Sequence, residues 1–268
     1  MASRIKKAQS AYDKGSIELS KKAHSRESIK KQLEHKEHTE TTGQYLGEFV
    51  YGAIDGTVTT FATVSGATGA ALSPGIVIIL GFANLIADGF SMACGNFLSE
   101  RSQRDYIAKE RKREEWEIEN VPEGEIEEIR QIFIKKGFKG RDLEKAVKTI
   151  TSSKKIWVDT MMTEELGLLE SNKSPWKTAA MTYFGFLIIG IIPLLSYVLS
   201  YFFPMFQRNT FTIAVFMTGV ALFIIGAVKR YVTKKNIWVS SLETLFIGGA
   251  AAVIAYFIGF LLRWIVTL

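Results

Sequence analysis

Long apolar stretches alternate with strongly polar ones along this chain. Residues 1–44 are charged, residues 48–99 are nearly free of charge, residues 100–174 are charged again, and residues 175–268 are mostly apolar. A helix that crosses a bilayer needs about 20 predominantly apolar residues. Five windows meet that requirement: 48–72, 74–99, 176–203, 210–228 and 243–266. The pattern predicts an all-α, polytopic membrane protein with five transmembrane helices in two groups, 45–99 and 175–268.

The two charged segments predict the parts of the protein outside the membrane. Residues 1–44 have no apolar region behind their basic residues, so we interpret them as a polar, partly helical cytosolic tail and not as a signal peptide. The histidines of this tail, His24, His35 and His38, are interpreted as solvated and not as metal ligands. In residues 100–174 the second apolar helix continues into water, Pro122 suits the first turn of a new helix, and Gly137 suits its end. With two further short helices, this segment predicts an inserted cytosolic domain of three to four helices.

The distribution of charge sets the expected orientation. The formal net charge of +6 is compatible with nucleic-acid binding, but ten Lys and Arg residues fall in residues 1–47 and none in the loop between the first two windows. Residues 100–174 are again basic, whereas Arg208 alone lies between the third and fourth windows. Positive charge is enriched in cytoplasmic loops, so the N-terminus is expected in the cytoplasm and the C-terminus outside or in a lumen. The lipid bilayer, and not nucleic acid, is the expected partner.

Two of the apolar windows contain carboxylic acids. Asp55 lies in the first, and Asn84, Asp88 and Met92 follow one another at four-residue spacing in the second, which places them on one helical face. A charge at the centre of a bilayer costs about 2.5–3.5 kcal/mol on insertion scales, and such residues usually mark a transport pathway. Two alternatives remain open. Asp55 could cap a helix at the interface, and the polar stripe could serve only for hydrogen bonds between helices.

A second candidate site lies in the charged segment after the second window. Nine glutamates occupy residues 110–128, and four of them form two pairs at i, i+3 spacing. Two adjacent methionines precede a further glutamate by four and three residues. Carboxylate oxygens bind hard and borderline divalent cations, and thioether sulfur favours transition metals, so the pattern predicts a site for Fe²⁺ or Mn²⁺. The alternative is an ordinary solvated acidic face with methionines in a core. The candidate ligands are Glu114, Glu117, Glu125, Glu128, Met161, Met162 and Glu165.

Four stretches in the same order resemble the vacuolar iron transporter family. They are YGAIDGTVTTFAT at residues 51–63, residues 85–99 with their SM-x-x-G-N core, the acidic helix at residues 122–128, and WVDTMMTEELGL at residues 157–168. The resemblance covers about residues 45–268. It implies five transmembrane helices, a homodimer with the pathway between the two first helices, and a cytosolic metal-binding domain. It also implies a proton-coupled antiporter that moves Fe²⁺, often with Mn²⁺, out of the cytosol.

The resemblance assigns roles to individual residues. Asp55 and Met92 match the pathway aspartate and methionine of the family. The candidate ligands above, except Met162, match its cytosolic metal ligands, and Met162 stands beside them. Asn84 stands where plant-like members have a glutamate, and Asp88, one turn nearer to Met92, would supply the missing acid. The implied ligands are Fe²⁺, Mn²⁺ or Zn²⁺ as substrate and at a regulatory site, with no prosthetic group, and the implied membrane is the plasma or the vacuolar membrane.

Two other classes of function compete with transport. A membrane sensor or scaffold would bind metal through its acidic domain without transporting it. An enzyme is not expected, because the sequence has no Ser/His/Asp set, phosphate-binding loop or di-iron motif.

Overall fold

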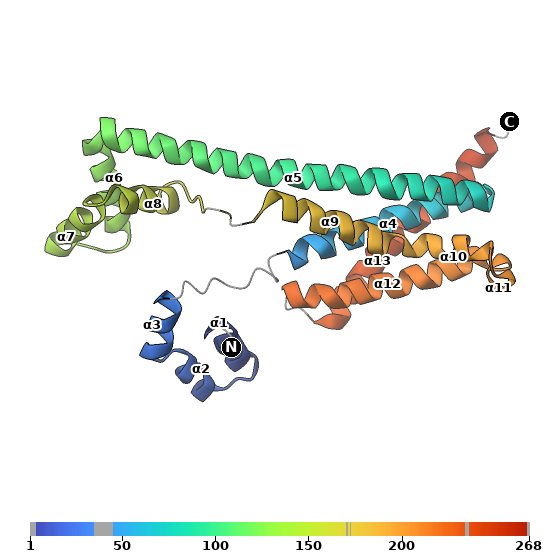
Figure 1. Ribbon diagram of the computed structural model, residues 1–268, viewed down its shortest axis with the longest axis horizontal. Helices are drawn as coiled ribbons and strands as arrows, with labels where there is room; N and C mark the ends of the chain where they lie inside the picture. Colours follow the sequence, from blue (N-terminus) through green and yellow to red (C-terminus); the bar gives the residue numbers. More distant parts are fainter. Residues whose placement is uncertain (1–3, 35–44, 170, 172, 234–235, 267–268) are drawn as a thin grey trace.

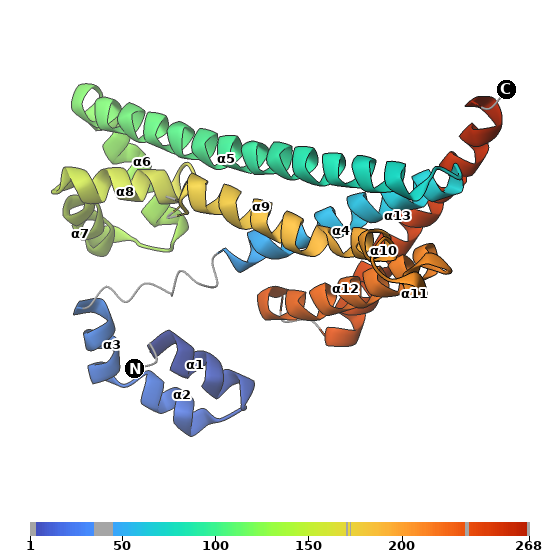
Figure 2. The same ribbon diagram turned by 45° about the vertical axis from the view of Figure 1, so that its right-hand side comes forward.

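The computed structural model describes residues 4–34, 45–169, 171, 173–233 and 236–266, and every regular element in these ranges is a helix. The all-α class is therefore confirmed for the described part of the chain. Figure 1 shows a bundle of apolar helices, from which one long helix extends to a smaller group of helices. The N-terminal helices form a third group (Figures 1 and 2).

The apolar bundle contains most of the hydrophobic windows. Its helices are α4 (Leu46–Gly69), the first half of α5 (Pro74–Asn120), α9 (Pro175–Gly190), α10 (Ile192–Ser200), α12 (Thr210–Thr233) and α13 (Ile237–Val266). The short helix α11 (Pro204–Gln207) joins α10 to α12. Helix α4 is central, because it contacts α5, α9, α10, α12 and α13.

Glycines on α4 explain its close contact with α9. A Cβ atom at Gly52 would lie 2.2 Å from the carbonyl oxygen of Thr182, and one at Gly56 would lie 2.5 Å from that of Phe186. Only hydrogen at these positions lets the two backbones approach, which is how membrane helices pack in the absence of a hydrophobic driving force. This packing places the first apolar window in the interior of the bundle.

Within the described residues, three helices are individually long and apolar enough to cross a membrane: α5, α12 and α13. Helices α9 and α10 pass the same test as a pair bent by 41°, with the break at Ile191 and with Pro193 in the first turn of α10. A proline inside an apolar helix removes a hydrogen bond and bends it. Helix α4 has 24 residues, a length of about 36 Å, but its glycines, threonines and Asp55 make it less apolar than the others. Four of the five expected crossings therefore have candidate spans, and the crossing by α4 remains a prediction.

Helix α5 connects the bundle to the second group of helices. Its 47 residues give a length of about 70 Å, roughly twice the thickness of the hydrocarbon core. Its C-terminal half packs with α6 (Pro122–Lys135), α7 (Gly140–Thr151) and α8 (Lys154–Glu164), and we call residues 100–165 the helical unit. Its core includes Ile129 and Met161, both fully buried.

The predicted boundaries of these helices are largely correct. Pro122 occupies the first turn of α6, and Gly137 follows its end with φ of +94°, a left-handed conformation that favours glycine. The helical unit consists of the end of α5 and three further helices, as the sequence indicated.

The N-terminal segment contains α1 (Arg4–Asp13), α2 (Ile17–Ala23) and α3 (Arg26–Glu34), which contact one another. The expectation of a partly helical tail is confirmed. His24 follows the end of α2, where its ring Nδ1 lies 2.9 Å from the carbonyl oxygen of Ser20. His35 and His38 lie outside the described residues, so their predicted solvation is untested.

Candidate metal centre

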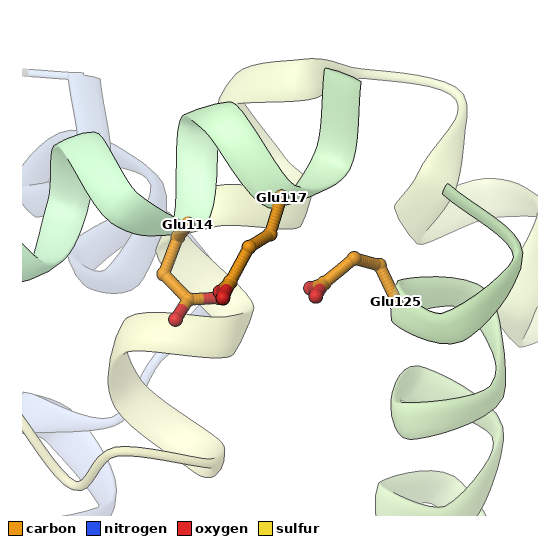
Figure 3. A group of neighbouring side chains, drawn as sticks. All are labelled: Glu114, Glu117 and Glu125. Atoms are coloured by element: carbon orange, nitrogen blue, oxygen red, sulfur yellow. The ribbon is translucent and has the colours of Figure 1, made fainter. Parts of the chain in front are cut away.

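Three of the predicted acidic ligands converge where α5 ends and α6 begins. Glu114 and Glu117 lie on the last turns of α5, and Glu125 lies in the first turn of α6. Val121 alone separates the two helices, and Pro122 can follow immediately because the first residue of a helix needs no N–H donor. Helix α6 therefore folds back beside the end of α5. Figure 3 shows the three side chains directed toward one another, with carboxylate oxygens within 4.8 Å of each other.

Two of these carboxylates are buried without adequate hydrogen bonding. Glu114 is 1% exposed and Glu125 is 7% exposed. Both oxygens of Glu114 and Oε2 of Glu125 have no hydrogen-bond partner in the described part of the chain. Buried polar atoms are nearly always hydrogen-bonded, and exceptions mark strained or functional positions. Exposed acidic runs are solvated faces, so the burial of this cluster argues against that alternative.

Arg113 is the positive charge within the cluster. Its guanidinium lies 2.9 Å from Glu110 and 3.1 Å from Glu117, and it hydrogen-bonds to both. Its Nη2 also lies 2.9 Å from Oε1 of Glu114, as an ion contact without hydrogen-bond geometry. Sequence reasoning missed Arg113, although its spacing of three and four residues from Glu110 and Glu117 is the signal for such pairs on a helix.

The pKa values of the cluster reflect its crowding. The pKa of Glu125 is raised to about 7, first by burial and then by the negative charges of Glu128 and Glu114. The pKa of Glu165 is also raised to about 7, first by partial desolvation of its carboxyl group and then by the charge of Glu128, with which that group hydrogen-bonds, although Glu165 as a whole residue is exposed. Burial is likewise the main cause of the raised pKa of Glu114. These shifts show that all five predicted acids, Glu117 included, lie close enough to interact.

The predicted methionines lie in the core of the helical unit. Met161 is fully buried and Met162 is 4% exposed, and both pack in the cluster around Ile129 and Val158. Glu165 immediately follows α8, and its N–H donates to the carbonyl oxygen of Met161 at 3.0 Å. The end of α8 thus places Met161 and Met162 close in the chain to Glu165, which interacts with the acidic cluster. Packing in the core agrees with the alternative interpretation of these methionines, and their role as ligands remains a prediction.

The aspartates of the membrane helices lie on adjacent helices. Asp55 is the tenth residue of α4 and half-buried, so the interpretation of Asp55 as a helix cap is wrong. Asp88 is exposed on α5, and its charge acts on Asp55. Met92 is partly buried against the core of the bundle. Asn84 is also partly buried, and its Nδ2 has no hydrogen-bond partner among the described residues.

One polar residue of the same stripe has a structural role. Asn96, one turn beyond Met92, donates to the hydroxyl oxygen of Thr182 on α9 at 2.8 Å. The hypothesis of hydrogen bonding between helices is therefore correct at this position. The described contacts assign no such partner to Asn84, and the pathway role of Asn84, Asp88 and Met92 remains a prediction.

The chemistry available to the acidic cluster is the binding of a divalent cation. Five carboxyl groups interact, and Arg113 supplies a single positive charge to them. Carboxylate oxygens are the preferred ligands of Mg²⁺, Ca²⁺ and Mn²⁺, and suit Fe²⁺ as well. A bound cation would compensate the remaining charge and would provide partners for the unpaired oxygens of Glu114 and Glu125.

Comparisons with known proteins agree on one family. The model of the VIT family matches residues 46–260. The chain is 36% identical to the "Vacuolar iron transporter" of Plasmodium berghei over 96% of this chain and 95% of that protein. It is 35% identical to the protein of the same name from Toxoplasma gondii, over 98% of this chain and 89% of that protein. It is 34% identical to "Vacuolar iron transporter 1" of Arabidopsis thaliana, over 84% and 89%.

Proposed function

This chain belongs to the VIT family, and from that premise we propose that it is a membrane transporter that moves Fe²⁺ out of the cytosol. The proposal includes the vacuolar membrane as its location, since the relatives are named vacuolar iron transporters. It also includes five crossings, with α4 as the first, and an N-terminus and helical unit in the cytosol. The observation that carries the proposal is the buried carboxylate cluster of Glu114, Glu117 and Glu125 on a chain with several apolar helices.

The route that we propose follows α4 and α5. Asp55 and Asp88 interact across these helices, and Met92 lies one turn beyond Asp88. Two carboxylates can replace water around a cation, and a thioether favours Fe²⁺ over harder ions. Asp88 is exposed in the single chain, which supports a homodimer in which a second copy closes the route. An ionisable side chain directed at lipid would be costly without such a partner.

Proton coupling is proposed from the acidic cluster. With pKa values of about 7, Glu125 and Glu165 are close to half-protonated at neutral pH. A metal ion binds the ionised carboxylates, so its binding releases protons. We infer that the helical unit collects the cation with Glu114, Glu117, Glu125, Glu128 and Glu165, assisted by Met161 and Met162. The same chemistry accepts Mn²⁺ or Zn²⁺.

Reconstitution tests this function. Purified protein is placed in vesicles that enclose an Fe²⁺-sensitive dye and a pH indicator, and Fe²⁺ is added outside under anaerobic conditions. We expect dye response together with proton movement in the opposite direction, both greater when the enclosed space is acidic. A metal series with Mn²⁺, Zn²⁺ and Ca²⁺ then establishes selectivity. No flux of any of these ions into vesicles that contain folded protein would contradict the proposal.

The second candidate function is a metal-responsive membrane sensor. It is favoured by one observation, since the acidic cluster lies wholly within the helical unit and needs no transmembrane residue for its geometry. It predicts that the intact protein binds Fe²⁺ and protects α5 and α6 from hydrogen exchange, yet shows no flux in the vesicles described above.

A further inference from the structure

A cavity of about 640 Å³ lies where α5 leaves the apolar bundle. One wall is a single face of α5, with Phe97, Arg101, Arg104 and Arg111 at helical spacing. The other wall is the segment before α9 together with its first residues, including Trp176. The volume is within the range of ordinary small-molecule sites. None of these residues takes part in the acidic cluster or in the proposed route of the metal.

The position of the cavity corresponds to a membrane boundary. The apolar part of α5 ends just after Phe97, and the apolar part of α9 begins at Trp176. The rings of these two residues are stacked at an angle, with centroids 4.6 Å apart, and Trp176 remains 74% exposed. Aromatic side chains of this kind concentrate at the level of lipid headgroups.

The charge of the cavity is positive and only partly compensated. Three arginines and Asp105 line it. Arg111 is paired with Asp159 of α8, and Arg101 lies 3.8 Å from Asp105 with both side chains mostly exposed. Arg104 makes no ion pair within the described part of the chain. Like charges on one helical face repel each other unless an anion lies between them.

Ser171 and Ser174, on the wall opposite the arginines, hydrogen-bond to α5 and to the residue before α4. The Ser171 hydroxyl donates to Oε1 of Glu100 at 2.5 Å, and the Ser174 N–H donates to the hydroxyl of Tyr45 at 2.8 Å. Ser174 also precedes the first turn of α9, where Pro175 brings no N–H donor of its own. These hydrogen bonds fix the position of the opposite wall, and the space between this wall and the arginines is available to a ligand.

We propose that this cavity binds the phosphate group of an anionic lipid from the leaflet on the side of the helical unit. Guanidinium groups bind phosphate oxygens through paired hydrogen bonds and are suited to this anion. Basic pockets at the cytosolic ends of membrane helices bind anionic headgroups, because that leaflet is negatively charged. Arg101 and Arg104 contact the phosphate, and Trp176 and Phe97 contact the glycerol region and the upper acyl chain. The choice of leaflet rests on the orientation given under Proposed function.

The proposal has a further consequence for the architecture. A bound lipid would contact both α5 and the segment that leads back into the membrane at α9. It would thus fix the angle at which the helical unit leaves the bilayer, with Arg111 extending the contact to α8 through Asp159.

Lipid titration of the full-length protein tests the site. The protein, in uncharged detergent, is titrated with dioleoyl phosphatidic acid, dioleoyl phosphatidylcholine and inorganic phosphate, and bound ligand is resolved by native mass spectrometry. We expect selective binding of phosphatidic acid. The double variant Arg101→Gln/Arg104→Gln should bind it about thirtyfold more weakly, from the usual contribution of two basic residues near a membrane. The matched variant Arg141→Gln/Lys148→Gln removes the same charge from exposed positions on α7 and should bind normally.

Three results would overturn the proposal. An equal loss of affinity in both double variants would indicate a general effect of net charge. Equal affinity for phosphatidic acid and phosphatidylcholine would show that the phosphate contacts contribute nothing. Inorganic phosphate bound as tightly as phosphatidic acid would show that the site does not recognise lipid.

A fluorescence measurement tests the same site with all of its arginines in place. The fluorescence of Trp176 is the difference between the emission of the wild type and that of Trp176→Phe. In bilayers with brominated acyl chains, this fluorescence should be quenched more by brominated phosphatidic acid than by brominated phosphatidylcholine. Equal quenching would refute the site. The flux assay separates the two claims: selective lipid binding without metal flux contradicts only the proposed function, and flux without selective binding contradicts only this inference.

Discussion

Replacement of Glu125 by glutamine should stabilise the metal-free helical unit at alkaline pH. The pKa of Glu125 is about 7 in the folded protein, against 4.5 for the unperturbed group. Because the unfolded chain loses this proton first, the folded state loses stability as pH rises from about 4.5 to about 7. The difference of about 2.5 units corresponds to about 3 kcal/mol. This is an upper value, since Glu128 and Glu114 would relax once the neighbouring charge is removed.

Hydrogen exchange of α6 amides measures this effect in the full-length protein. In chelator at pH 8, Glu125→Gln should slow local opening of α6 by up to about a hundredfold, after correction for the intrinsic exchange rate. At pH 4.5 the variant and the wild type should be alike. Glu123→Gln is the matched control, because Glu123 lies in the same turn and is exposed. Its effect should stay within about 0.5 kcal/mol at both pH values.

Addition of Fe²⁺ should reverse the order of stability. A ligand that binds only the folded state stabilises it in proportion to the logarithm of its concentration over Kd. The wild type, with its full set of carboxylates, should gain more protection than Glu125→Gln. If Glu125→Gln opens as fast as the wild type at pH 8 without metal, the buried cluster carries no electrostatic strain and the reasoning is refuted.

Three further changes test other parts of the account. Gly56→Ala should reduce the stability of the bundle by about 1–3 kcal/mol, since the added Cβ would lie 2.5 Å from the carbonyl oxygen of Phe186. Thermal unfolding in detergent measures this effect. Gly47→Ala is the control, because Gly47 has open space around it and the substitution should not lower stability. Met161→Leu should preserve folding at a cost below about 1.5 kcal/mol. Competition titration should show that the variant has a reduced preference for Fe²⁺ over Mg²⁺. An unchanged preference would show that Met161 is a core residue and not a metal ligand. Arg113→Gln should move the midpoint of metal binding to higher pH, because Arg113 lowers the pKa values of nearby carboxyls, and Arg113→Lys should restore most of the original midpoint in a pH series.

The helices could be predicted from the sequence where residues close together in the chain determine the limits of a helix. The apolar windows, Pro122 and Gly137 each act within a few residues, so the helices of the bundle and of the helical unit were predicted with nearly correct limits. The bend between α9 and α10 has a local cause as well, since Pro193 lies in the first turn of α10. The first window was less clear, since its glycines and threonines make α4 a poor candidate by hydropathy while its packing makes it central.

The site depended on tertiary contacts that spacing alone does not determine. Spacing placed Glu114 beside Glu117, but the sharp turn at Val121 is what brings Glu125 to them. The burial of Glu114 could not be read from a run of nine glutamates, which usually remains in solvent. Arg113 was not predicted, because the sequence does not show which of Arg111, Lys112 and Arg113 faces the carboxylates. Asp88 lies on the exposed face of α5, and which face of α5 is exposed depends on helix packing that residue spacing does not determine.

The central claim is that iron crosses the membrane along the route of Asp55, and flux in proteoliposomes under a pH gradient tests it most directly. Asp55→Asn should reduce Fe²⁺ uptake to the level of protein-free vesicles while metal binding by the helical unit persists. Asp142→Asn, on the exposed surface of α7, should transport as the wild type does. Fe²⁺ uptake by folded Asp55→Asn at the wild-type rate would contradict the account.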